Sequence, residues 1–156
     1  MTNPTAALAA AQSGILAPPP PLATYLLFQA PEAGVEELVE TLSNHFAEAI
    51  ATGELVVGLG SNLLDDADSA IGYHRYQQPN DGYAASPANP ADLAIWLRGS
   101  DRGDLLHLSR NLVATLNQGC HLTSITHGFT HKRRPTDDDF IVHDLSGFED
   151  GTENPQ

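Results

Sequence analysis

Two periods of hydrophobic positions alternate along the chain. Leu22–Gln29 (LATYLLFQ) is a short apolar run rich in strand formers, with prolines on both sides, and it predicts a first strand. From Glu32 onward, apolar residues recur at spacings of three and four, which predicts an amphipathic helix that ends near Gly53. The apolar stripe of this helix consists of Val35, Leu38, Val39, Leu42, Phe46 and Ile50.

Three more strands and a second helix are predicted in the same way. The runs 54–60 and 91–99 read as strands, separated by a long connection over 61–90. The third strand contains Trp96, which we expect in the core. Leucines at spacings of three and four after residue 101 predict a helix that stops at Gly119, and the Thr- and Ile-rich run 121–131 predicts a fourth strand.

The order β-α-β-β-α-β is that of a ferredoxin-like α+β fold, in which two helices cover one face of a four-stranded antiparallel sheet. A chain of 156 residues is expected to build one such compact domain. We therefore divide the chain into three segments. Residues 1–21 form a flexible leader that ends in four prolines, residues 22–131 the ferredoxin-like domain, and residues 132–156 a trailing arm.

The net charge and the composition of the chain indicate which partners and which cellular compartment to expect. Acidic residues outnumber basic ones 20 to 7, so a nucleic acid or an anionic membrane would be repelled. No stretch approaches the roughly 20 apolar residues of a membrane span, and the first residues lack the basic region of a secretory signal. We therefore expect a cytoplasmic protein. Cys120 is the single cysteine, which excludes an intramolecular disulfide, and we expect a buried free thiol.

Two groups of residues could be interpreted as metal sites, but for both groups an interpretation without a metal is favoured. The histidines of the fourth strand have spacings that place them on one face, but residues four apart on a strand lie roughly 13 Å apart, too far for a shared ion. These histidines are His121, His127 and His131. The acids Asp65, Asp66 and Asp68 lack the ligand spacing of a calcium loop. Polar strand residues and solvated acids are favoured, and no metal ligand is assigned.

The last residues, GFEDGTENP, combine features that constrain one another. Gly147 and Gly151 permit backbone conformations closed to other residues, so Asp150 between them can be held on a tight loop with its carboxylate facing a cavity. An acid presented in this way can transfer protons. An alternative is that Glu149, Asp150 and Glu153 bind a hard metal such as Mg²⁺ or Ca²⁺, but three neighbouring acids do not make a coordination sphere.

The segment SGFEDGTENP resembles the GxxDG signature of the dye-decolorizing peroxidases, with a GTENP continuation typical of their bacterial branches. LVVGLGSNLL, PADLAIWLRGSDRGDLLH and DDDFIVHDLSGFEDGTENP are similar, in order and spacing, to the N-terminal half of that family. The resemblance runs from about residue 22 to the end. It implies one half of a DyP-type dimeric α+β barrel, in a family of haem peroxidases built from two ferredoxin-like halves.

The resemblance also implies the chemistry. Asp150 matches the acid on the distal side of the haem, where a base takes a proton from one oxygen of hydrogen peroxide and delivers it to the other. The loop lining the haem edge matches Gly151, Thr152, Glu153 and Asn154. The electron donors would be dyes, phenols or similar small reductants. In this family the second half supplies the proximal histidine and a distal arginine, so the haem b iron ligand is expected outside this chain.

Two functional hypotheses follow. The first is a DyP-type peroxidase seen through its N-terminal half, inactive alone, whose partner is either the missing C-terminal half or another copy of the chain. The second is a non-catalytic ferredoxin-like module that associates with itself or with a partner chain, because half of a two-domain fold leaves apolar surface uncovered.

Overall fold

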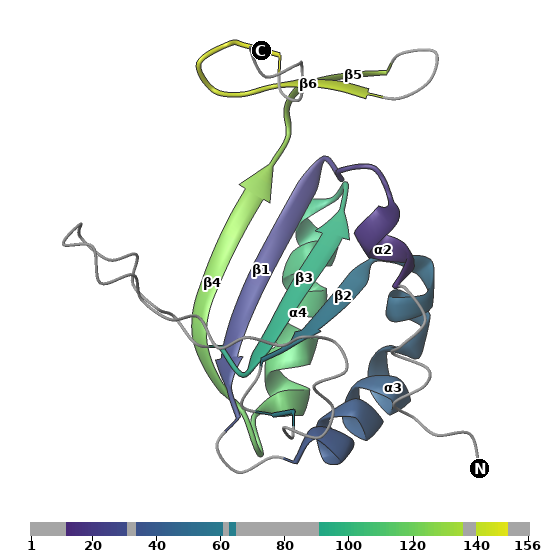
Figure 1. Cartoon of the computed structure of the whole chain (residues 1–156), viewed down its shortest axis with the longest axis vertical. Coiled ribbons are helices and arrows are strands. Elements are labelled where there is room, and N and C mark those ends of the chain that lie inside the picture. Colours follow the sequence, from purple (N-terminus) through teal and green to yellow (C-terminus); the bar gives the residue numbers. More distant parts are fainter. Residues whose placement is uncertain (1–11, 31–33, 61–62, 65–90, 136–139, 150–156) are drawn as a thin grey trace, which may run out of the picture.

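The structure, a computed structural model, describes residues 12–30, 34–60, 63–64, 91–135 and 140–149. These residues form a main sheet with helices on one face and a small hairpin beyond one end of the sheet (Figure 1). The described elements are α2 (Ser13–Leu16), β1 (Leu22–Gln29), α3 (Val35–Thr52), β2 (Leu55–Leu59), β3 (Leu93–Gly99), α4 (Arg102–Leu116), β4 (His121–Phe129), β5 (His131–Pro135) and β6 (Phe140–His143).

The main sheet has the strand order β2-β3-β1-β4, and every neighbouring pair is antiparallel. Leu26, in the middle of β1, lies opposite Ile95 of β3 on one side and Ile125 of β4 on the other. The predicted fold class, an α+β unit with a four-stranded antiparallel sheet, is confirmed. None of the described helices combines the length and the apolar character that a bilayer-spanning helix needs.

Helices α3 and α4 cover one face of this sheet and enclose the core. Alternate residues of β1, β2 and β3 point into it, as the two-residue period of a strand requires. The fully buried side chains include Leu26, Phe28, Leu42, Leu55, Leu93, Ile95, Leu97 and Leu112. Cys120 is also buried in this cluster, as expected.

Local sequence signals set the ends of both helices. At the start of α4, Asp101 Oδ1 accepts hydrogen bonds from the backbone N–H groups of Gly103 (2.7 Å) and Asp104 (3.0 Å). At the end of α3, Gly53 adopts the left-handed conformation (φ 80°) and its N–H donates to Ile50 O.

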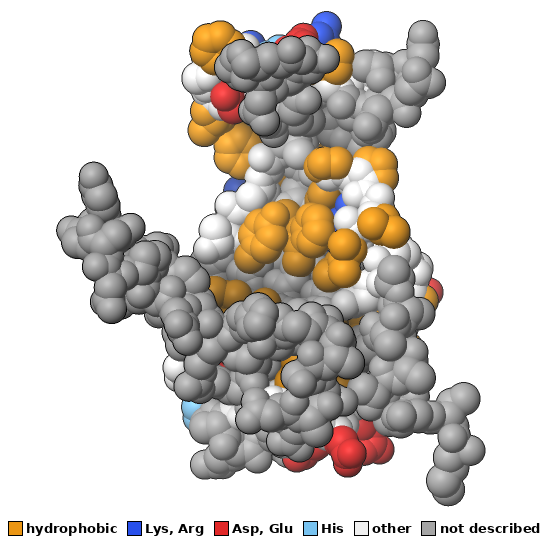
Figure 2. All heavy atoms as spheres, in the orientation of Figure 1, with side chains coloured by type: hydrophobic (Ala, Val, Ile, Leu, Met, Phe, Trp, Pro, Cys, Tyr) orange, Lys and Arg blue, Asp and Glu red, His pale blue; other side chains and the backbone are white. Residues whose placement is uncertain are grey.

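The opposite face of the sheet is not covered by these helices, and Figure 2 shows hydrophobic side chains gathered over its middle. Trp96 lies on this face, so its expected place in the core is wrong. The core positions of β3 are Leu93, Ile95 and Leu97, and Trp96 alternates with them. It stacks on Tyr25 of β1, with ring centroids 6.0 Å apart and an interplanar angle of 14°.

Residues 12–21 of the expected leader contact the domain. The Gln12 side chain donates to Val57 O (2.7 Å) and accepts from Val57 N (2.8 Å) along the outer edge of β2. Arg98, buried on the open face of the sheet, donates to Ala17 O (3.1 Å) and to Pro18 O. This part of the leader is therefore held by hydrogen bonds at both ends.

The trailing arm contains a hairpin that the sequence did not predict. Strand β5 pairs antiparallel with β6, with a register shift between His131 and Arg134. The fourth strand of the main sheet ends at Phe129 rather than at His131, and a short link through Thr130 leads into the hairpin (Figure 1). The basic run Lys132, Arg133 and Arg134, whose charges favour a solvated loop in the sequence, lies in β5.

Candidate functional site

The described chain ends one residue before the predicted catalytic acid. Asp150 and the predicted haem-loop residues Gly151, Thr152, Glu153 and Asn154 lie outside the described residues. Their assignments therefore stay predictions. The residues that lead directly into them, 144–149, are described and form a tight turn at the end of β6.

Asp144 organises this turn through one carboxylate oxygen. Its Oδ1 accepts hydrogen bonds from the backbone N–H groups of Ser146 (2.9 Å), Gly147 (3.0 Å) and Phe148 (3.3 Å), and also from the Ser146 hydroxyl. Backbone bonds close the same loop, from Asp144 N to Phe148 O (3.0 Å) and from Gly147 N to Asp144 O (3.1 Å). An aspartate that bonds the backbone two residues onward is a well-established turn former.

These hydrogen bonds also change the acidity of Asp144. The Ser146 hydroxyl, followed by backbone N–H groups, lowers the pKa of Asp144 below its ordinary value of 3.8. Donors that point at a carboxylate favour its charged form. Asp144 is therefore ionised near neutral pH and serves as the acceptor that shapes the turn.

Gly147 occupies the position in the turn that needs glycine. Its φ is 97°, a region that residues with a Cβ rarely adopt. The turn also presents two large apolar side chains to solvent, Leu145 (78% exposed) and Phe148 (75% exposed). Exposed apolar groups beside a predicted ligand loop provide a surface against which a flat apolar ligand can pack.

Glu149 fixes the far end of the turn to the hairpin. Its backbone forms an isolated antiparallel bridge with His143 of β6. Its carboxylate lies 3.2 Å from the Arg134 guanidinium of β5. Both side chains are exposed, so this ion pair contributes little, and the backbone bridge rather than the Glu149 side chain holds the end of the turn.

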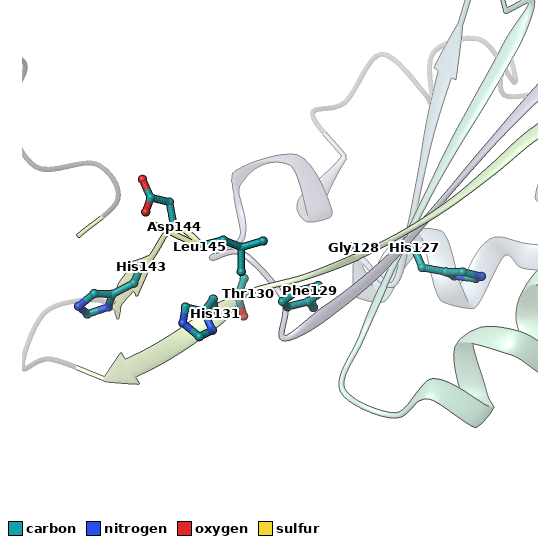
Figure 3. Close-up of a pocket in the computed structure, with 8 residues that line it drawn as sticks. All are labelled: His127, Gly128, Phe129, Thr130, His131, His143, Asp144 and Leu145. Atoms are coloured by element: carbon teal, nitrogen blue, oxygen red, sulfur yellow. The ribbon is translucent and has the colours of Figure 1, made fainter. Parts of the chain in front are cut away.

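A pocket of about 420 Å³ lies between the end of β4 and the hairpin. Its lining consists of His127, Gly128, Phe129, Thr130, His131, His143, Asp144 and Leu145. Figure 3 shows His131 and His143 near one another on the two hairpin strands, where they are register partners, and His127 farther along β4. His143 Nδ1 and Thr130 Oγ1 are shielded from solvent and have no hydrogen-bond partner within the described part of the chain.

The three histidines considered as a metal site are not brought together. His127 contacts Thr24, with 3.2 Å between Nδ1 and Oγ1, on the helix side of the sheet. A register irregularity in β4 places His121 opposite Gln29, on the other face, and His131 belongs to the separate hairpin. The expectation that they share one face is therefore wrong, because the irregularity shifts the alternation by one residue.

Other metal candidates gain no support in the described ranges. Among residues 12–30, 34–60, 63–64, 91–135 and 140–149, no group of three or more His, Cys, Asp and Glu side chains is placed to hold a metal ion. The acids at 65, 66 and 68 lie outside these ranges, as do Asp150 and Glu153 of the hard-metal alternative.

The pocket and the turn fit one side of a haem site. Phe129, Leu145 and Phe148 supply exposed apolar surface, and the pocket has the size of a ligand pocket. His143 Nδ1 is a buried polar atom without a partner among the described residues, of a type that bonds ligands or metals. These features match what a large apolar ring with polar groups at its edge requires.

Sequence reasoning found the terminal motif but missed what precedes it. The hairpin and the Asp144 turn became visible only in the structure. One signal was present in the sequence: an aspartate two residues before Ser146 and three before Gly147 is typical of a side-chain-capped turn.

Comparison with curated proteins supports the resemblance. No family model matches the chain. A dye-decolorizing peroxidase of Brevibacterium linens is 27% identical over 153 residues, which cover 91% of this chain and 40% of that protein. A second, from Mycolicibacterium paratuberculosis, is 26% identical and is matched over 41% of its length. The chain therefore spans less than half the length of the curated relatives it matches.

Solved structures give the same result. The encapsulated DyP-type peroxidase from Mycobacterium smegmatis superposes with a TM-score of 0.65 and 26% identity, over 93% of this chain and 48% of that one. A Rhodococcus jostii DypB variant in complex with haem superposes with a TM-score of 0.60 and 25% identity, over 90% and 47%. The resemblance predicted from the sequence is confirmed: over about nine-tenths of its length, this chain is similar to the dye-decolorizing peroxidases.

Proposed function

We propose that this chain forms the peroxide-facing side of a DyP-type haem peroxidase, with Asp150 as the proton-transferring acid. The observation that carries the proposal is the turn at residues 144–149. Two independent tethers, the Asp144 hydrogen bonds and the Glu149 bridge to His143, fix the backbone that enters Asp150. The similarity to haem-containing and peroxidase relatives supports the choice of cofactor and reaction.

In this proposal the haem, when bound, supplies the iron that holds peroxide and the electrons that break its O–O bond. Asp150 would take a proton from one oxygen of hydrogen peroxide and return it to the other oxygen, which would leave as water. Gly151, Thr152, Glu153 and Asn154 line the haem edge. Phe129, Leu145 and Phe148 supply apolar surface to the ring.

The cofactor in this proposal is haem b, and the donors are dyes, phenols or similar small reductants. We expect the iron ligand to come from outside this chain, as the family resemblance implies. We therefore expect the chain alone to bind haemin with little peroxide turnover. Catalysis would require a second half, supplied by another polypeptide or by a longer version of this one, in the cytoplasm.

A titration with haemin tests the cofactor. The purified chain is expected to shift the Soret band in a saturable way, with an end point near one haem per chain. Glu149→Gln, which removes a neighbouring carboxylate, should bind as the wild type does. A spectrum that stays that of free haemin at every protein concentration would contradict haem binding by this chain.

Turnover tests Asp150 separately. The chain is joined to the part of the Brevibacterium linens peroxidase that it does not match, and peroxide-dependent oxidation of a phenol is measured. Because general acid–base catalysis contributes typically 10²–10⁴-fold, Asp150→Asn should lower kcat/KM by about 100-fold or more, while the haem content is kept. Glu149→Gln should stay within about threefold. Equal activity of the Asp150→Asn and wild-type fusions would contradict the assignment.

A second candidate function is a non-catalytic module that associates through the open face of the sheet. The stacked pair of Tyr25, which is 42% exposed, and Trp96 favours it, because a large aromatic patch on a sheet face is typical of an interaction surface. Size-exclusion chromatography discriminates the candidates. A haem-free chain that elutes as a discrete oligomer and never binds haemin would favour the module.

A further inference from the structure

A second pocket, apart from the one beside the hairpin, lies along the segment that joins α2 to β1. Its volume is about 410 Å³, which is within the range of small-ligand sites. The lining includes the four prolines at positions 18–21, Glu54 and Arg98. Figure 1 shows the segment passing the end of β3 on its way from α2 to β1. The pocket therefore lies where the segment before β1 meets the end of the main sheet.

The guanidinium of Arg98 belongs to the wall of this pocket. It donates to the carbonyl oxygens of Gly53 (3.3 Å), Ala17 (3.1 Å) and Pro18, and all three of these residues also line the pocket. Arg98 is only 8% exposed. Its Nε is shielded from solvent and has no hydrogen-bond partner within the described part of the chain. One donor of a buried cation is therefore unused at this pocket.

The positive charge of Arg98 also lacks a counter-ion. A charge that is removed from water is normally paired with an opposite charge, because burying it alone is costly. Among the residues that the structure describes, no carboxylate is paired with Arg98, and its hydrogen-bond partners are neutral carbonyl groups. Glu54 lines the same pocket, but it is exposed and forms no ion pair with Arg98. An anion in the pocket would supply the missing charge.

A second donor next to Arg98 is unused as well. Trp96 Nε1 is shielded from solvent and has no partner among the described residues. The centroid of the Trp96 ring lies 4.8 Å from the guanidinium carbon of Arg98. Indole and guanidinium N–H groups donate hydrogen bonds and cannot accept them, so a ligand that satisfies them must bring an acceptor. The prolines at positions 18–21 give the pocket apolar walls that suit a flat apolar body.

We propose that this pocket binds a small aromatic carboxylate. The carboxylate accepts a hydrogen bond from Arg98 Nε–H and neutralises the guanidinium, and the aromatic ring packs against the prolines at positions 18–21. Because Nε is shielded from solvent, ligand entry includes a small movement of the pocket wall. The terminal NH2 groups of Arg98 keep their carbonyl partners, so the segment before β1 stays attached. This proposal does not depend on haem binding.

Proton–nitrogen NMR spectra of the haem-free chain test the site with benzoate as the probe. Trp96 is the single tryptophan, so it gives the only indole signal, and Arg98 is followed by its Nε–H signal. At constant ionic strength, benzoate should shift both signals in a saturable way, with a dissociation constant of about 1 mM, as its small size allows. Benzamide has the same ring but no charge. It should bind at least about tenfold more weakly, because it lacks the charge-assisted hydrogen bond.

The variant Glu54→Gln tests the charge of the pocket while Arg98 is left intact. It removes a carboxylate that repels an anion, so benzoate should bind about two- to fivefold more tightly and benzamide as before. Glu40→Gln is the matched control: Glu40 is an exposed glutamate of α3 outside the pocket lining, so neither affinity should change. In Arg98→Met, which removes the cation, benzoate should lose its advantage over benzamide.

Circular dichroism confirms that each variant is folded before it is compared. Since Arg98 also holds the segment before β1, an unfolded Arg98→Met would leave the decision to Glu54→Gln and to the two probes. Equal affinities of the wild type for benzoate and benzamide would overturn the proposal. So would Trp96 and Arg98 signals that do not move up to about 50 mM benzoate, far above the expected dissociation constant. A Glu54→Gln chain with an unchanged preference for benzoate would overturn it as well.

Discussion

The guanidinium carbon of Arg98 lies 4.8 Å from the ring centroid of Trp96, on the open face of the main sheet. The same guanidinium donates hydrogen bonds to Gly53 O (3.3 Å) and Ala17 O (3.1 Å). One buried cation therefore joins the aromatic patch, the end of α3 and the segment that precedes β1. This buried guanidinium is tolerated because its two terminal NH2 groups donate to carbonyl oxygens and its carbon lies over an aromatic ring, although Nε has no partner within the described part of the chain.

Removing this cation should loosen the attachment of the segment before β1. We expect Arg98→Ala to lower the free energy of unfolding by about 2–3 kcal/mol, because the carbonyls of Gly53 and Ala17 lose a charged donor. Urea unfolding measures this loss. The control is Arg102→Ala, an exposed arginine at the start of α4, which should change stability by less than about 0.5 kcal/mol. Equal losses in the two variants would show that Arg98 does not have this role.

A pair of glycines tests the contact between α2 and the end of α3. A Cβ on Gly53 would lie 2.9 Å from Gly14 N, and the φ of Gly53 is 80°. Gly53→Ala should therefore cost about 1–2 kcal/mol or more. On Gly58 of β2 a Cβ would lie 3.6 Å from the Ala94 Cβ, an ordinary contact, so Gly58→Ala should be neutral or stabilising by up to about 1 kcal/mol.

Thermal or urea unfolding of both variants measures the change in the free energy of unfolding that each glycine substitution causes. Opposite signs are expected because the substitution is strained at one position and relaxed at the other. A Gly53→Ala protein as stable as the wild type would mean that the end of α3 readjusts without cost and that α2 is not seated against it.

The turn before Asp150 should depend on the ionisation of Asp144. Its pKa is lower in the folded protein than the ordinary value of 3.8, with the Ser146 hydroxyl as the largest cause. The stabilising effect is therefore complete above pH 3.8 and is lost as the pH falls through the lowered pKa. A titration followed by NMR should show the Ser146 and Gly147 amide signals moving with the Asp144 carboxyl.

The variant Ser146→Ala removes the first of these donors. We expect the Asp144 pKa to rise toward 3.8 in this variant, and the amide shifts to move at correspondingly higher pH. Ser100→Ala, at an exposed serine outside the turn, is the control and should leave the titration unchanged. An Asp144 that titrates at the same pH in all three proteins would contradict the hydrogen-bonded turn.

The sequence predicted the main sheet well because each strand and helix carries its own period. The alternation of Leu93, Ile95 and Leu97 also shows the limit of this reasoning. Trp96 was expected inside because it is large and apolar, yet the strand period places it on the other face, where Tyr25 and Arg98 cover it. The size and hydropathy of a single residue do not decide which face it lies on, because its place in the strand alternation does.

The hairpin shows a different limit. Strand β5 has the sequence HKRRP, which contains three charges and a proline and gives no strand signal. It forms a strand because β6, with the sequence FIVH, pairs with it. Pairing between a weak and a strong segment is a property of both stretches together, so neither stretch predicts it alone. The motif at the end of the chain was recognisable because its glycines, acids and proline are contiguous.

The Cys120 thiol should react only slowly with alkylating reagents as long as the core is closed. Its side chain is only 3% exposed, and burial, followed by the carboxylates of Asp92 and Glu37, raises the pKa of the thiol. Since the thiolate is the reactive form, both effects act against alkylation. We expect iodoacetamide to label the native chain at pH 8 at least about 100-fold more slowly than the chain in urea, because reaction then requires the rare open state.

A relocated thiol provides the control for this prediction. In a Cys120→Ser background, Ser100→Cys places the single thiol at an exposed position after β3, where labelling should be equally fast with and without urea. If native Cys120 were labelled as quickly as this surface thiol, the junction between α4 and β4 would open readily in solution. The slow labelling that we expect would instead show that β4 is anchored at its start by a closed core.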